Sequence, residues 1–447
     1  MKQNQKTRVI PAEFILPFIL VTTLFSLWGF ANDITNPMVA AFRTILLISN
    51  FESSLVQFAF YTGYCLMAIP AALFIRRFNY KMGILVGLFL YAAGCVLFIP
   101  AGNAMAFWAF LMAYFVMTCG LSFLETTANP YILSMGAGET STRRLNFAQA
   151  FNPMGSILGM FIAKNLILAN LDPTTEAERL AMVNTNPEAL SKIQQADLSV
   201  VSAPYLILGA VVFAFFLLFL MAKLPKVVTD TANKLSLKQT MKKLIHNKIY
   251  LWSILAQAVY VGVQIMVWTF IIQYAESELG MPKKTAQAYN IVAMAIFVSS
   301  RFICTFLLKF FKPAQLLATL AIAGAMFTLG AILLPNAPYV EDQYFGAYWG
   351  LFSLVAISAC MSLMFPTIYG IALKGMGDEA KLASAGLIVA IGGAAILPPI
   401  QGWLIDKAVW FGESLSAIRI SFVLSLVCFI IIAIYGRWVQ KLRASQE

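Results

Sequence analysis

The nine residues Ile-Arg-Arg-Phe-Asn-Tyr-Lys-Met-Gly at positions 75–83 decide the fold, because they place three basic side chains in a short turn between two long apolar stretches. The stretch before the turn covers residues 54–75, and the stretch after it covers 82–100. Each is close to the roughly 20 apolar residues that an α-helix needs to cross a bilayer. The turn therefore predicts two antiparallel membrane helices joined on the cytoplasmic side, where loops are rich in Lys and Arg.

The rest of the chain repeats this alternation of apolar stretches and short polar connections. Twelve stretches in all are apolar and long enough to span a membrane, so we expect an all-α membrane protein with twelve transmembrane helices. The predicted spans cover residues 14–40, 54–75, 82–100, 104–133, 146–169, 204–223, 249–274, 286–308, 314–335, 344–372, 382–403 and 416–436.

The composition supports membrane embedding and argues against a soluble enzyme. Hydrophobic residues make up 60% of the 447 residues and charged residues only 11%, whereas soluble domains carry about 25% charged residues. The six cysteines lie inside apolar stretches without a metal-binding spacing, and no phosphate-binding glycine loop or nucleophile motif is present. The sequence therefore predicts no enzymatic activity, no cofactor and no metal site. Without a nucleotide fold, any transport would use an ion gradient or be passive.

The basic residues alternate between two sets of connecting segments. The set that includes both termini holds 22 Lys and Arg, and the opposite set holds seven. This bias places both termini in the cytoplasm, most simply at a bacterial-type inner membrane. It also explains the net charge of +11 without a nucleic-acid partner. Anionic lipid is an alternative partner for the basic run 223–248, but a solvated linker that sets topology explains it as well.

Two similar halves are visible in the connections. The segment Leu-Lys-Phe-Phe-Lys-Pro at 308–313, after the eighth predicted span, is a short basic turn like the one after the second. We therefore predict an N-terminal six-helix half (1–223), a cytoplasmic linker (224–248) and a C-terminal six-helix half (249–447). This layout resembles the major facilitator superfamily, in which the two halves are parallel repeats.

Only two of the twenty acidic residues, Asp33 and Glu125, fall deep inside predicted spans. A carboxylate at the bilayer centre costs about 2.5–3.5 kcal/mol on insertion scales. Protonating a glutamate at pH 7 costs roughly 3.7 kcal/mol from its reference pKa. Because the two costs are close, small changes in hydration or neighbours would switch Glu125 between charged and neutral forms. We interpret Glu125 as a proton-coupling group; the alternative is a hydrogen bond that packs two helices.

The first span carries a polar segment, Ala-Asn-Asp-Ile-Thr-Asn-Pro at 31–37. Asp33 and Asn36 share a helix face at i,i+3, and Pro37 loosens the helix by removing a backbone donor. This segment predicts a site element near the middle of the membrane. The alternative is that Asp33 lies close to the outer surface and is hydrated.

Amides and aromatic rings follow single faces on several other spans. Amides exchange hydrogen bonds with hydroxyl groups, and rings cover the apolar C–H faces of sugars, so a central cavity for a neutral polyhydroxylated ligand is expected. Interhelical hydrogen bonding is the alternative for each residue alone. Arg301 is interpreted as a structural residue that pairs inside the bundle. The predicted binding residues are Asp33, Asn36, Gln57, Tyr61, Glu125, Asn129, Gln149, Asn152, Gln257, Tyr260 and Gln264.

Two neighbouring motifs carry a resemblance to a known family. The string Leu-Ser-Phe-Leu-Glu-Thr-Thr-Ala-Asn-Pro at 121–130 and the string Arg-Leu-Asn-Phe-Ala-Gln-Ala-Phe-Asn at 144–152 resemble the fucose:proton symporter family. Leu-Trp-Gly-Phe at 27–30, Phe-Tyr-Thr-Gly-Tyr at 60–64 and Phe-Pro-Thr-Ile at 365–368 resemble it too. The resemblance extends over nearly the whole chain.

The resemblance implies a proton-coupled importer of L-fucose and related sugars or amino sugars that works by alternating access. It implies that Glu125 is the helix-four carboxylate linked to proton movement, and that Asn152 borders the sugar cavity. The family usually has its helix-one acid at the position of Asn36. We hypothesise that Asp33, one turn earlier, takes that role and takes part in proton coupling as well as in sugar binding. Phe365 is counted among the sugar-binding positions, although a tyrosine is expected there and one hydroxyl contact is therefore absent.

Several alternatives remain at this stage. The chain could transport another hexose or an N-acetylhexosamine, and sodium could replace the proton. A drug–proton antiporter of the same fold would have fewer amides in its cavity, and a receptor without transport would not need two six-helix repeats. The expected partners are a small sugar, protons and the lipid bilayer, and a monomer is the default.

Overall fold

The computed structural model describes residues 10–136, 144, 147–149, 151–225, 237–307, 310–341, 346–373, 380–407 and 415–444. Within these ranges the chain is helical, and the β pairing found is an isolated bridge between Asn336 and Tyr348. The elements are η1 (Ala12–Phe14), α1 (Ile15–Thr35), α2 (Met38–Leu46), α3 (Asn50–Arg77), α4 (Tyr80–Val96), α5 (Phe98–Asn103), α6 (Phe107–Ser134), α8 (Phe151–Ile162), η3 (Ala163–Leu168), α9 (Glu176–Thr185), α10 (Pro187–Met221), α11 (Leu237–His246), α12 (Lys248–Leu279), α13 (Lys283–Leu307), α14 (Pro313–Leu333), α15 (Trp349–Met361), α16 (Met364–Leu373), α17 (Ala380–Val389), η5 (Ala390–Gly392), α18 (Gly393–Lys407), α19 (Ala417–Ser421) and α20 (Val423–Ala444).

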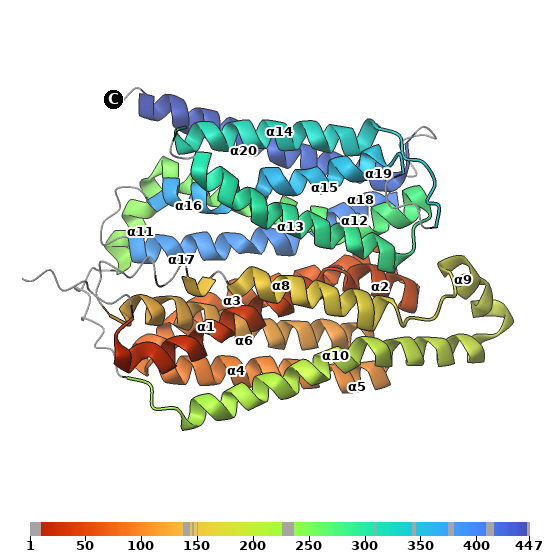
Figure 1. Cartoon of the computed structure of the whole chain (residues 1–447), viewed down its shortest axis with the longest axis horizontal. Coiled ribbons are helices and arrows are strands. Elements are labelled where there is room, and N and C mark those ends of the chain that lie inside the picture. The colour runs from red at the N-terminus through yellow and green to blue at the C-terminus, as the bar shows by residue number, and fades with distance from the viewer. Residues whose placement is uncertain are drawn as a thin grey trace, which may run out of the picture.

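The long helices run side by side and form two layers (Figure 1). Elements α1 to α10 form one layer, and α12 to α20 form the other. The described ranges contain 12 helical segments long and apolar enough to cross a membrane, which confirms the twelve spans expected from hydropathy. We name the end of the bundle that carries α11 and the C-terminus the near end, and the end that carries α9 the far end.

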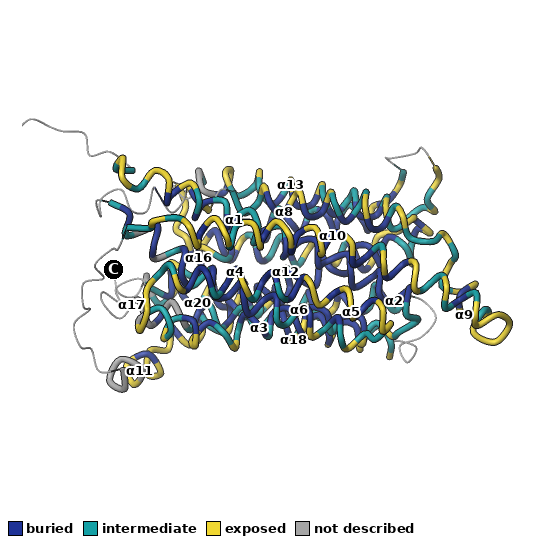
Figure 2. Tube along the Cα trace, turned by 90° about the horizontal axis from the view of Figure 1, so that it is seen from below, coloured by how far each residue is buried: buried dark blue, intermediate teal, exposed yellow. Residues whose placement is uncertain are grey.

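The perimeter of the bundle is apolar, as contact with lipid requires. Large side chains such as Leu66, Phe89 and Ile434 are 60%, 56% and 62% exposed. Buried residues follow the middle of the bundle along its length, whereas exposed residues lie around it and on α9 and α11 (Figure 2). A fold that hides its polar groups and exposes aliphatic side chains is stable only where lipid replaces water.

Two glycines bring α1 and α8 into backbone contact. A Cβ atom at Gly155 would lie 1.9 Å from the backbone oxygen of Ser26, and one at Gly29 would lie 2.1 Å from that of Asn152. Only glycine permits so close a crossing, as is common where membrane helices pack. The crossing sets the polar residues of α1 and α8 at the same level.

The largest departure from the predicted spans is at the sixth. The expected span began at residue 204, but α10 begins at Pro187, where Asn186 caps the helix and proline occupies its first position. The preceding helix α9 packs against this extension through Arg179 and Asp197, whose side chains form a 2.6 Å ion pair and are 1% and 2% exposed. Hydropathy does not reveal the extension of α10, because it counts Arg179 and Asp197 as separate charges, whereas in the fold they neutralise each other.

The two layers are joined at the far end by polar contacts. The Asp406 carboxylate on α18 accepts hydrogen bonds from the backbone N–H of Asn50 at 3.0 Å, its Nδ2 at 2.8 Å and the N–H of Phe51 at 2.8 Å. It thus caps the N-terminus of α3 in the opposite layer, where a negative charge is favoured. On α2, Arg43 contacts Glu276 of α12 at 3.5 Å. We call these contacts the far-end seal.

Replacing Asp406 with Asn is expected to open the far-end seal. The amide removes the charge from three hydrogen bonds and from the helix N-terminus, a loss of about 1–2 kcal/mol. The ratio of open to sealed molecules should therefore rise about five- to thirtyfold. Spin labels on cysteines introduced at the exposed positions Glu188 and Val340 would report this as a larger population at long distance.

Glu52→Gln is the matched control, because Glu52 also binds the N-terminus of α3 but pairs with Ser49 of its own layer. Its distance distribution should equal that of the unaltered protein. Identical distributions for Asp406→Asn and Glu52→Gln would contradict the assignment of Asp406 to the seal.

Candidate functional site

A polar cavity lies between the two layers near the middle of the bundle. Its volume is about 150 Å³, roughly the share of five waters in the liquid. Helices α1 and α8 supply the wall on one side, and α12, α13 and α16 supply the other. The lining residues are Asn32, Asp33, Asn152, Pro153, Ser156, Tyr260, Gln264, Trp268, Met294, Phe297, Val298, Arg301 and Phe365.

Asp33 is the acidic residue on the cavity wall, and its side chain is held by neighbours. It is 2% exposed. Asn36 donates a hydrogen bond from Nδ2 to the Asp33 carboxylate at 3.0 Å. Ser156, whose hydroxyl donates to the backbone oxygen of Gly29 at 3.4 Å, and Asn32 line the same cavity. The Tyr61 hydroxyl donates to Asn32 Oδ1 at 2.9 Å and so orients that amide. Asp33 therefore lies in the interior and not in water at the outer surface.

The helix α1 ends at Thr35, and α2 resumes at Met38 beyond Pro37. The interruption agrees with the loosening that the proline predicts. It places Asn36 between two helices, where its Oδ1 accepts a hydrogen bond from Gln57 Nε2 at 3.0 Å. The Gln57 Nε2 atom also donates to Thr269 Oγ1 of the opposite layer at 3.0 Å. Asn36 and Gln57 are thus a hydrogen-bonded extension of the Asp33 group, beyond the cavity wall.

On α12, the residues Tyr260, Gln264 and Trp268 line the cavity at intervals of four. Trp268 Nε1 donates to Ser358 Oγ at 3.1 Å, and the Tyr260 hydroxyl donates to the backbone oxygen of Met361 at 3.1 Å. Both rings are therefore fixed from behind by α15. The wall they form has apolar faces and leaves the Gln264 amide, which is partly exposed, as a polar group of the cavity.

On α13, Phe297 and Arg301 complete this wall. The guanidinium carbon of Arg301 lies 4.9 Å from the Phe297 ring centroid, and its Nε donates to the backbone oxygen of Ser362 at 3.2 Å. Phe297 packs edge-on against Trp268 with the ring centroids 5.1 Å apart. The cavity therefore contains a carboxyl group on one layer and a stacked guanidinium on the other.

A second polar group lies in the first layer around Glu125. The Glu125 side chain is partly exposed, but its Oε2 atom is sealed and has no hydrogen-bond partner. Asn129 Nδ2 donates to the backbone oxygen of Glu125 at 3.1 Å, and Gln149 Nε2 donates to Asn129 Oδ1 at 3.2 Å. These three residues form one cluster on α6 and the segment before α8, and none of them lines the cavity.

Of the positions singled out from the sequence, Asp33, Asn152, Tyr260, Gln264 and Phe365 lie together on the cavity wall. Asn36 and Gln57 form the hydrogen-bonded extension behind the cavity wall, and Tyr61 holds the Asn32 amide. Glu125, Asn129 and Gln149 form the separate cluster described above. Gln257 stands apart on α12: it is 0% exposed, and neither its Oε1 nor its Nε2 has a partner.

The cavity also contains residues that the sequence pattern did not select. Arg301, which we had interpreted as structural, lines it, and so do Asn32 and Ser156. The available signal for Arg301 was its spacing of four from Phe297 and of seven from Met294 on one helix face. Asn146 and residues 226–236 of the linker lie outside the described residues. Among the described residues, no group of three His, Cys, Asp or Glu could hold a metal ion.

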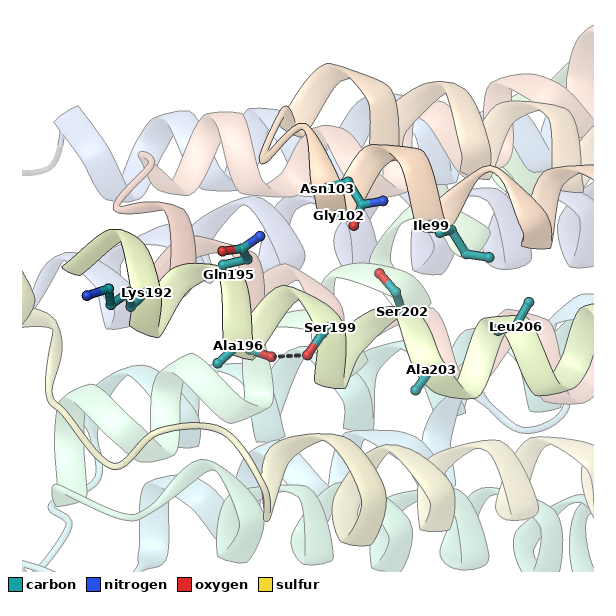
Figure 3. Close-up of a pocket in the computed structure, with 10 residues that line it drawn as sticks. All are labelled: Ile99, Gly102, Asn103, Lys192, Gln195, Ala196, Ser199, Ser202, Ala203 and Leu206. Carbon is teal, nitrogen blue, oxygen red and sulfur yellow. Dashed lines mark hydrogen bonds between the residues drawn. The ribbon is translucent and has the colours of Figure 1, made fainter. Parts of the chain in front are cut away.

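A larger hollow, of about 560 Å³, lies between α5 and α10 on the outside of the first layer (Figure 3). Its walls come from one layer only, and Lys192 at its rim pairs with Glu188 at 2.9 Å. Ser199 donates to the backbone oxygen of Ala196 at 2.6 Å and is satisfied locally. Size alone therefore does not make it the functional site. The smaller cavity is lined by residues of both layers and contains both an acidic residue, Asp33, and a basic residue, Arg301.

Two layers of membrane-spanning helices around a polar cavity define a multi-pass membrane transporter. Residues 19–389 match the family model described as Major Facilitator Superfamily. An L-fucose-proton symporter of Haemophilus influenzae is 50% identical over 96% of this chain and 97% of its own length. An L-fucose-proton symporter of Escherichia coli is 33% identical over 95% and 93%.

A solved structure is also similar along nearly the whole chain. The crystal structure of the transporter FucP in the outward conformation aligns with a TM-score of 0.68 at 32% identity, covering 96% of this chain and 99% of that one. The chain belongs to the Major Facilitator Superfamily and, within it, to the fucose:proton symporter family.

Proposed function

We propose that this protein imports L-fucose together with a proton across a bacterial cytoplasmic membrane. The observation that carries the proposal is the cavity between the layers, with Asp33, amides and aromatic rings on its wall, in a chain 50% identical to an L-fucose-proton symporter. The near end, with α11 and the basic linker, faces the cytoplasm, because its connections hold most of the Lys and Arg. One chain lines the whole cavity, so a monomer is sufficient.

The sugar binds between the two layers. Its hydroxyl groups exchange hydrogen bonds with Asp33, Asn152 and Gln264, and its apolar C–H face lies against Trp268 or Phe365. Because Phe365 has no hydroxyl, specificity on that side comes from shape and from the amides. Arg301 balances the charge of Asp33 across the cavity.

Glu125 carries the proton. Its buried Oε2 atom has no hydrogen-bond partner, and a carboxylate oxygen buried without a partner is costly, so the neutral form suits this conformation. Asn129 and Gln149 extend a polar path from Glu125 along the first layer. When the near end is hydrated, water can accept the proton and stabilise the charge.

Transport follows from rocking of the two six-helix halves, 1–223 and 249–447, about the cavity. In the conformation described, the far-end seal closes the outer side through Asp406 and Arg43. Opening that seal admits sugar and a proton from outside. The charged, empty carrier returns slowly, because an ionised Glu125 keeps a charge on a buried Oε2 atom that has no hydrogen-bond partner.

Replacing Glu125 with Gln should separate sugar movement from proton movement. The amide mimics the neutral acid, so counterflow of labelled L-fucose in proteoliposomes is expected within about twofold of the unaltered protein. Accumulation driven by a proton gradient should fall to the equilibrium level. Glu188→Gln, a change at an exposed carboxylate, is the control and should accumulate normally. Uphill accumulation by Glu125→Gln would rule out the coupling role of Glu125.

Replacing Asp33 with Asn should abolish coupled uptake and weaken sugar binding about tenfold or more, because it removes a charged hydrogen-bond acceptor. The double change Asp33→Asn with Asn36→Asp returns an acid to the neighbouring turn, at the position the family usually uses, and should restore part of the uptake. Tritiated L-fucose binding and uptake measure both effects. Full uptake by Asp33→Asn alone would show that Asp33 does not replace the family's acid.

A panel of competing sugars tests the substrate. L-fucose should compete best, and D-glucose, D-galactose and N-acetylglucosamine should compete weakly. Stronger competition by one of these sugars would make that sugar the substrate. Uptake that depends on a sodium gradient and not on a pH gradient would make sodium the coupling ion in place of the proton.

A further inference from the structure

Four buried amides lie between the central cavity and the far-end seal: Gln57, Gln273, Gln287 and Asn290. They are 0–1% exposed. None of them lines the cavity. We call them the outer amide set, and their position between the halves suggests a role in the path from outside.

The face of α12 that meets the first layer carries Gln273. Thr269, one turn before it, accepts the hydrogen bond from Gln57 at 3.0 Å. Glu276, one turn after it, contacts Arg43 at 3.5 Å. Gln273 therefore lies on the interface that separates when the far-end seal opens, because both flanking contacts cross between the halves.

The face of α13 that lines the cavity also continues outward through amides. Met294, Phe297 and Arg301 on this face line the cavity. Asn290 and Gln287 follow at spacings of four and three, and Lys283 after them pairs with Glu276 at the seal at 2.5 Å. One stripe of α13 thus leads from the seal to the cavity through Gln287 and Asn290.

The outer amide set is poorly satisfied in the sealed conformation. Asn290 Nδ2 donates to the backbone oxygen of Trp268 at 3.1 Å and to Gln287 Oε1 at 3.4 Å, but its Oδ1 has no partner. Gln287 Nε2, Gln57 Oε1 and both amide atoms of Gln273 also have none. Buried polar groups without partners are unfavourable, and an aliphatic residue would fill these sites without that cost. The unpaired atoms of these amides gain by a conformation that brings them partners.

We propose that the outer amide set is a second sugar subsite, which a neutral polyhydroxylated ligand occupies first when the far-end seal is open. Side-chain amides offer both donors and acceptors, and a sugar offers both in return. When the seal closes, water and sugar leave these amides, and several of their polar atoms are left without a hydrogen-bond partner, as in the conformation described. The inference rests on the proposed function, since it assumes that sugar enters from the far end.

The test is the double variant Gln287→Leu with Asn290→Leu in proteoliposomes of defined orientation. The apparent KM for L-fucose entering from the far end should rise about five- to thirtyfold, from the loss of one or two neutral hydrogen bonds. The apparent KM from the near end should stay within twofold. Gln401→Leu is the matched control, because Gln401 is a buried amide on α18 whose Oε1 also has no partner, but it binds Ser421 inside one layer and lies outside the α12 and α13 faces described above. It should change neither value.

A shift of the whole protein toward the sealed conformation would also raise the far-end KM. Adding Asp406→Asn to the double variant distinguishes the two causes, because it favours the open seal. If the subsite is lost, the KM stays raised; if it returns to the original value, a change of conformation was the cause and the proposal is overturned.

The variant Asn290→Cys gives an independent measurement, because cysteine is similar in volume to the asparagine that it replaces. A membrane-impermeant maleimide added outside should label Asn290→Cys above the background of the native thiols, and L-fucose should slow labelling at least severalfold. Absence of labelling, or labelling that L-fucose does not slow, would overturn the subsite. If the unaltered protein neither binds nor transports L-fucose, it is the proposed function that fails.

Discussion

A polar side chain at the middle depth of a bilayer must find a partner inside the protein, because the hydrocarbon offers none. Asp33 meets this requirement through Asn36, whose Nδ2 donates a hydrogen bond to its carboxyl group. Glu125 meets it only in part, since one carboxylate oxygen is sealed without a partner. This difference supports the proposed division of roles, in which Asp33 binds the sugar and Glu125 exchanges the proton.

The same constraint links the site to the conformational change. At the far end, Asp406 is satisfied by the N-terminus of α3, and together with the Arg43–Glu276 contact it joins the two halves. When the halves separate there, water replaces those donors, and the amides behind the seal gain access to it. In the proposed cycle, the rocking of the two halves and the exchange of protein hydrogen bonds for water at the far end therefore occur together.

Much of this could be predicted from sequence, because hydropathy and helical spacing are local properties. The twelve spans followed from apolar length, and the pairing of Asp33 with Asn36 followed from their i,i+3 spacing. Contacts between distant helices could not be predicted in this way. Spacing tells which residues share a face but not which helix faces them, so Arg301 was assigned to structure and the bond from Gln57 to Thr269 was not foreseen. The early start of α10 was missed because Arg179 and Asp197 neutralise each other only once folded.

The external pH of lightly buffered vesicles, recorded as L-fucose is added, tests the central claim most directly. Binding of sugar in the cavity and of a proton at Glu125 predicts alkalinisation outside that begins with L-fucose, is absent with a non-competing sugar and disappears with a protonophore. Entry of labelled L-fucose without any change of pH would contradict the account, because it would remove the proton from the cycle and with it the role of Glu125.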